Sequence, residues 1–235
     1  NMNFLDCILT VLIVLILAVS KPITKNSEIF GRDSTASLRG LAMLGIMLHH
    51  IQNELGLCSP ILIQVGYIAT GLFFFISGYG NTISLNKNGS SIKWIWNKFL
   101  KIYIPFFVVY WFCFICLYAI YPLELPTEIE TIKDMVTISL PNQASWFPKI
   151  ILLCFAVHWL ANKLFLNKKI QTLVVFCCIV IYIAVMWKKG FAACWYNSVI
   201  CYAIGILVSE MREHFSTMLL EKRRRIYIYR LGDCI

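Results

Sequence analysis

Long apolar runs separated by short polar segments dominate this chain of 235 residues. A helix that crosses a bilayer needs about 20 mostly apolar residues, because the hydrocarbon core is ~30 Å thick and each residue rises ~1.5 Å. The stretches that approach this length lie near residues 4–20, 35–52, 60–80, 99–121, 147–166, 170–187 and 191–209. The pattern therefore predicts an all-α fold, a polytopic transmembrane helix bundle of about seven spans.

The composition requires a membrane environment. Hydrophobic residues make up 59% of the chain and charged residues only 14%, more apolar surface than a soluble domain can bury. The first run, 4–20, lacks the basic start of a signal peptide and carries Asp6, so we expect an extra N-terminal span rather than a cleaved leader.

Basic residues gather in alternate connections. Lys and Arg outnumber Asp and Glu by 21 to 12, and they concentrate near 21–32, 87–93, 163–169 and 212–225, whereas acidic residues concentrate near 124–134. Cytoplasmic loops carry such an excess, so the N-terminus is expected outside and residues 211–235 form a basic cytoplasmic tail after a transmembrane domain at 1–210. Because anionic headgroups explain this charge, the expected partner is the lipid bilayer and not nucleic acid.

Ten cysteines do not indicate a metal site. Most lie within apolar runs, where cysteine is usually a small hydrophobic residue. The Cys113-x-x-Cys116 pair has no further soft ligands near it in the sequence. We therefore expect no bound metal.

The stretch 38–50, LRGLAMLGIMLHH, carries ionisable groups inside a predicted span. At 100° per residue, Arg39 and His50 fall within about 20° of one line and ~16 Å apart along a helix, whereas His49 is ~80° off that line. Intramembrane ionisable groups tend to face a wet interior, so we expect Arg39 and His50 to line one wall of a buried groove. Two alternatives stay open: Arg39 could reach lipid phosphate, and His50 could be an interfacial histidine satisfied by water.

Two later segments carry further candidate residues. Residues 71–80, GLFFFISGYG, place Ser77 and Gly78 among phenylalanines, where small residues allow close helix packing. Lys98 and Lys101 lie three residues apart near the start of the next span, with Pro105 further in. These lysines could bind lipid headgroups or the phosphates of a cytosolic ligand.

Taken in order, these elements resemble those of the acyltransferase-3 family of integral membrane acyltransferases. The family pattern is an arginine, ten residues and a histidine, then an FFxxSGF-like element, then RxxR with a nearby proline. Here the elements read Arg39 to His50, then residues 73–79, then Lys98 and Lys101. Weaker matches are residues 145–147 and 201–207, and the resemblance covers about residues 34–208.

The chain departs from the family pattern in three ways. Both arginines of RxxR are lysines, which keep the charge but lose bidentate phosphate recognition. An extra span, 4–20, precedes the arginine element. Family members usually have more spans than this chain, so the resemblance implies that the end of the domain is missing or replaced by the basic tail.

The resemblance implies transfer of an acyl group, commonly acetyl from acetyl-CoA, to a hydroxyl of a glycan or other cell-envelope acceptor in a bacterial inner or plasma membrane. Acyl-CoA would be a co-substrate and not a bound cofactor. His50 would be the general base or would carry the acyl group transiently. Arg39 would hold the donor or stabilise developing negative charge.

The remaining assignments concern binding. Lys98 and Lys101 would bind the CoA phosphates on the cytoplasmic side. Ser77, Gly78 and Tyr79 would shape a channel for the acyl group.

Two other functions stay open. A transporter or channel subunit would need ionisable groups on several helices, and the last spans offer little beyond His158, Asn162 and Asn197. We interpret His158, beside Trp159, as a satisfied packing histidine. The other possibility is an inactive, truncated relative that serves as a membrane scaffold.

Overall fold

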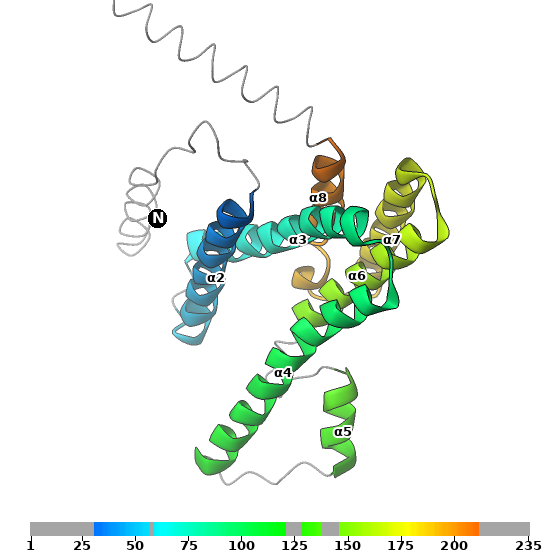
Figure 1. Ribbon diagram of the computed structural model, residues 1–235. Coiled ribbons are helices and arrows are strands. Elements are labelled where there is room, and N and C mark those ends of the chain that lie inside the picture. The colour runs from blue at the N-terminus through cyan, green and yellow to red at the C-terminus, as the bar shows by residue number, and fades with distance from the viewer. Residues whose placement is uncertain (1–30, 57–58, 121–127, 138–145, 212–235) are drawn as a thin grey trace, which may run out of the picture. The chain divides into compact units, whose positions relative to one another are not determined.

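The computed structural model describes residues 31–56, 59–120, 128–137 and 146–211. Within them the chain forms seven α-helices and one short 3-10 helix, and no strand (Figure 1). The elements are α2 (Arg32–Glu54), α3 (Pro60–Asn88), α4 (Ile92–Ile120), α5 (Glu128–Thr137), α6 (Trp146–Leu164), α7 (Lys168–Lys188), η1 (Ala193–Trp195) and α8 (Ile200–Glu210). The predicted all-α membrane fold is confirmed.

Five described segments are long and apolar enough to cross a membrane: Pro60–Asn88, Ile92–Cys116, Trp146–Leu164, Lys168–Lys188 and Ala193–Glu210. The second expected span, 35–52, is helical throughout as part of α2. It contains Arg39 and His50 and is not among these five segments. The expected first span, 4–20, and nearly all of the expected tail, 211–235, lie outside the described residues.

The link between α3 and α4 is shorter than the sequence pattern predicts. Helix α3 continues to Asn88 instead of ending near residue 80, and α4 begins at Ile92 instead of residue 99. Gly89 ends α3 with a φ of 69°, a conformation that side chains other than glycine rarely adopt. The Oγ of Ser91 then accepts a hydrogen bond from the backbone N–H of Trp94, at 3.2 Å, and caps α4. Lys98 therefore lies inside α4 and not ahead of it.

The last expected span, 191–209, is broken. Helix α7 ends at Lys188, Gly190 turns the chain with a φ of 72°, and η1 precedes α8. The hydroxyl of Tyr182 on α7 donates to the carbonyl oxygen of Trp195 in η1, at 3.1 Å. This bond ties the short element to α7.

The described residues fall into two compact units, and helices α3 and α8 each contribute to both. In the first unit, made of the residues up to Gly80 and from Ile204 onward, α2 packs on α3 where glycines leave room. A Cβ on Gly45 would lie 3.0 Å from Val65, and a Cβ on Gly66 would lie 2.5 Å from the ring of His49. Small residues at such crossings allow membrane helices to approach closely.

The second unit, residues 81–203, is organised around α6, which packs against α7, α4 and η1. The buried rings of Phe106 and Tyr110 on α4 pack with Met135 of α5 and Leu152 of α6. Tyr110 also hydrogen-bonds Thr131 of α5, and α5 lies beside the C-terminal half of α4 (Figure 1). Helix α4 continues through Pro105, which has no N–H to give to the carbonyl four residues earlier.

Candidate functional site

Arg39 and His50 lie on one uninterrupted helix, α2, as the sequence predicts. The eleven-residue separation therefore corresponds to ~16 Å along the axis. Both side chains are exposed, and no described residue encloses them. The buried groove around these two residues stays a prediction.

His49 is fixed by side-chain contacts that His50 lacks, although the sequence predicted no role for His49. Its ring lies against Gly66 of α3, and its Nδ1 is 3.3 Å from the carbonyl oxygen of Leu62. Its Nε2 is 3.2 Å from the side-chain amide nitrogen of Asn53. Because a carbonyl only accepts, Nδ1 carries the proton and Nε2 accepts from Asn53. His49 is thereby a fixed contact between α2 and α3.

The side chain of His50 is exposed. It meets His49 edge-on, with ring centroids 5.5 Å apart and planes at 72°. It makes no hydrogen bond to any residue that the structure describes. A general base or an acyl carrier needs an accessible imidazole nitrogen, and this placement meets that requirement.

The segment with Ser77, Gly78 and Tyr79 forms a packing surface of α3. Tyr79 is buried and stacks on Phe75, with ring centroids 6.5 Å apart. A Cβ on Gly205 of α8 would overlap the carbonyl oxygen of Phe75 and lie 2.9 Å from the backbone nitrogen of Tyr79. Close helix packing therefore accounts for Gly205 opposite this segment, and the acyl channel stays a prediction.

Lys98 and Lys101 differ in their surroundings although both lie on α4. Lys101 is exposed, whereas Lys98 is half-buried. The Nζ of Lys98 lies 5.2 Å from the centroid of Trp94 and 5.7 Å from that of Phe155 on α6. Rings at this distance attract a cation through their π faces. The two rings form what we call the Lys98 cradle.

A buried polar cluster lies in the same unit and was not predicted as a whole. The hydroxyl of Tyr202, which is fully buried, accepts a hydrogen bond from the side-chain amide of Asn81 at 3.1 Å. It lies 3.1 Å from Nδ1 of His158. Since the hydroxyl proton is the one left to donate, Nδ1 accepts it and Nε2 carries the ring proton. This agrees with the interpretation of His158 as a satisfied histidine.

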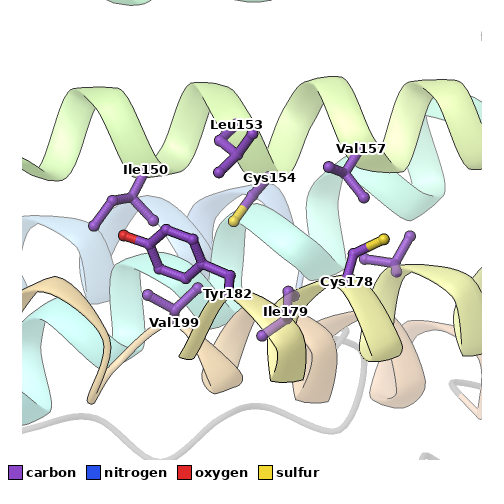
Figure 2. A pocket seen from close by; sticks show the side chains of 9 residues that line it. Ile150, Leu153, Cys154, Val157, Cys178, Ile179, Tyr182 and Val199 are labelled. Atoms are coloured by element: carbon purple, nitrogen blue, oxygen red, sulfur yellow. The ribbon is translucent and has the colours of Figure 1, made fainter. Parts of the chain in front are cut away.

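A small pocket lined by residues of α6, α7 and Val199 contains no charged side chain (Figure 2). Its lining is aliphatic except for Cys154, Cys178 and Tyr182. It supplies no base for catalysis. Nowhere in the part of the chain that the structure describes do three or more His, Cys, Asp or Glu residues gather in a way that could hold a metal ion.

Comparison with known proteins identifies a family. A family model described as an acyltransferase domain matches residues 36–229. The match contains all the candidate residues named from the sequence. No curated protein and no solved structure matches the chain.

Proposed function

The chain belongs to the acyltransferase 3 family, and from this membership we propose that it moves an acyl group from acyl-CoA to a hydroxyl of a cell-envelope glycan or similar acceptor. The family makes the protein a multi-pass membrane acyltransferase that uses an acyl donor. The match over residues 36–229 carries the proposal, because it contains the arginine–histidine, FFxxSGF-like and two-lysine elements together.

The donor binds at the start of α4. Lys98 and Lys101 are the cations of the third family element, and their three-residue spacing places both on one side of the helix. Basic loops mark this end of α4 as cytoplasmic, the compartment that contains CoA. The two ammonium groups offer point charges to the CoA phosphates.

His50 serves the acyl transfer itself. As a base, it takes the proton of the acceptor hydroxyl while the oxygen attacks the thioester carbonyl carbon. The carbon–sulfur bond then breaks, and the CoA thiolate takes up a proton to leave as the thiol. As a carrier, the imidazole attacks the thioester first and passes the acyl group to the hydroxyl afterwards. Arg39 offers positive charge to the donor or to the developing oxyanion.

Replacing His50 by Ala tests its role. We expect loss of transfer from radiolabelled acetyl-CoA to an envelope-glycan fraction by protein reconstituted in nanodiscs, with insertion and melting temperature unchanged. Met47→Ala is the matched control, since Met47 is an exposed residue of the same helix. Retained transfer by His50→Ala removes His50 from the chemistry. Mass spectrometry of wild-type protein given donor alone separates the two routes, since only a carrier gains the acyl mass.

The lysine pair is tested by donor binding. Lys98→Gln with Lys101→Gln is expected to weaken acetyl-CoA binding, measured as an equilibrium dissociation constant. The control pair, Lys168→Gln with Lys169→Gln, removes two exposed lysines at the start of α7 and leaves the constant unchanged. Equal donor affinity in the Lys98 and Lys101 variant would assign these lysines to lipid headgroups instead.

The acceptor is identified by mass spectrometry of envelope glycans from cells with and without the gene. We expect one glycan to gain the mass of an acyl unit only when the gene is present. Absence of any such difference would contradict a glycan acceptor.

A further inference from the structure

We propose that Tyr202 and Ser84 are positioning residues for the acyl donor, because they fix the two rings that hold the ammonium group of Lys98. The inference rests on the proposed donor-binding role of Lys98. It gives a role to the buried cluster of Asn81, His158 and Tyr202, which takes no part in the proposed acyl-transfer chemistry.

The first ring is fixed from α3. The indole Nε1 of Trp94 donates a hydrogen bond to the hydroxyl of Ser84, at 2.8 Å. Trp94 is buried, so this bond sets the orientation of an indole that has little access to water. The face that Lys98 approaches at 5.2 Å is therefore defined by a residue ten positions earlier in the chain.

The second ring is fixed through the buried cluster. Phe155 has no polar atom of its own, and it packs on Tyr202 with ring centroids 6.3 Å apart. Tyr202 cannot turn away, because its hydroxyl joins Asn81 on α3 to His158 on α6. The position of the Phe155 ring, 5.7 Å from Nζ, thus depends on a hydroxyl that never touches Lys98.

These residues lie at a common depth in their helices. Asn81 is seven residues before the end of α3, Lys98 six after the start of α4, and His158 six before the end of α6. All three helix ends adjoin the basic links, and the separations correspond to about 10 Å along each helix. A lysine this far inside keeps four rotatable stem bonds, so its ammonium group needs neighbours that restrict it if it is to meet a phosphate in one geometry.

The test measures acetyl-CoA binding to the full chain in nanodiscs. Tyr202→Phe keeps the ring and removes only the hydroxyl. Ser84→Ala keeps Trp94 and removes its acceptor, together with a 3.4 Å hydrogen bond from the side-chain amide of Asn88. Each is expected to raise the dissociation constant about threefold, the loss of one oriented cation–π contact. Tyr182→Phe is the matched control, because it removes a tyrosine hydroxyl bonded to Trp195 and leaves donor binding unchanged.

A second background separates positioning from general destabilisation. In a Lys98→Gln protein, Tyr202→Phe and Ser84→Ala should change the dissociation constant no further, since the cation they orient is gone. Equal effects in both backgrounds would show a merely structural role and overturn the inference. The use of two variants on different helices keeps the test valid if Tyr202→Phe does not fold.

The outcomes also distinguish this inference from the proposed function. A raised dissociation constant for Lys98→Gln, with both positioning variants equal to wild type, overturns only the inference. An unchanged constant for Lys98→Gln overturns the donor-binding role of Lys98 and the inference with it.

Discussion

Replacing Gly205 by Ala should destabilise the contact between α8 and α3. The alanine Cβ would overlap the carbonyl oxygen of Phe75 and would lie 2.9 Å from the backbone nitrogen of Tyr79. Both obstacles are backbone atoms of a helix, so no side-chain rotation can relieve the contact. The two helices would have to move apart, and the packing around buried Ile206 and Phe74 would loosen.

The size of the effect follows from two opposing contributions. Overpacking a tight site costs about 1–3 kcal/mol, and rigid backbone atoms place Gly205 at the upper end of this range. Alanine returns about 1 kcal/mol through its better helix propensity. The net loss is about 2 kcal/mol, equivalent to a melting temperature lower by about 4–8 °C in a chain of this size.

The assay is thermal unfolding of purified protein in nanodiscs. Gly80→Ala is the control, since a Cβ at Gly80 of α3 meets nothing within 4 Å and only the propensity gain remains. We expect Gly80→Ala to melt at or above the wild-type temperature. A Gly205→Ala protein that melts as high as Gly80→Ala would refute the close approach of α8 to α3.

Two further substitutions test single contacts. Gly66→Ala places a methyl group 2.5–2.8 Å from the Cγ, Nδ1 and Cβ atoms of His49. The His49 side chain must therefore shift, and its ring must leave both hydrogen bonds, at a cost of about 2 kcal/mol. In a His49→Gly background all three of these atoms are absent and the same methyl has room, so an equal loss of melting temperature in both backgrounds would contradict this contact. Trp159→Phe removes an indole N–H that donates to the carbonyl oxygens of Ser90 and Ser91, at 3.0 and 3.2 Å. We expect a loss of about 1 kcal/mol and faster protease cleavage of the α3–α4 link, and cleavage at the wild-type rate would show that Trp159 does not hold it.

Mean hydropathy was sufficient to find the long apolar helices, missed the short polar helix α5, and was insufficient to find some of the helix ends. The chain after Gly80 becomes polar, so the sequence predicts that the helix stops there. In the structure Asn81 is bonded to Tyr202 and Ser84 to Trp94, partners that lie 121 and 10 positions away. Polar residues can continue a membrane helix when such partners exist. A local sequence pattern does not reveal that Asn81 will bond to Tyr202, 121 positions away.

The broken last span has a similar cause. Averaged over residues 191–209 the sequence is apolar enough for one helix, and the segment Ala193–Glu210 still qualifies as a span. Asn197 and buried Ser198 interrupt it between η1 and α8. An average over about 20 residues hides a break of four.

The choice between adjacent histidines shows a limit of periodicity. Spacing alone relates His50 to Arg39 and leaves His49 without a role. Only the packing of α2 on Gly66 of α3 shows that His49 is the contact residue and His50 the accessible one. The contact between Gly66 and His49 depends on how α2 packs against α3, and this packing cannot be deduced from a single sequence.

Spatial neighbours also distinguish the two lysines that replace the arginines of the family pattern. An arginine brings its own planar orientation to a phosphate, whereas a lysine brings a point charge on a flexible stem. At Lys98 the proposed source of orientation is the pair of neighbouring rings, Trp94 and Phe155. Exposed Lys101 has no ring contact of this kind among the described residues. On the proposed donor-binding role the two positions are therefore unequal: Lys98 would be restricted before the donor arrives, whereas Lys101 would be ordered by it, and the entropy cost of binding would fall mainly on Lys101.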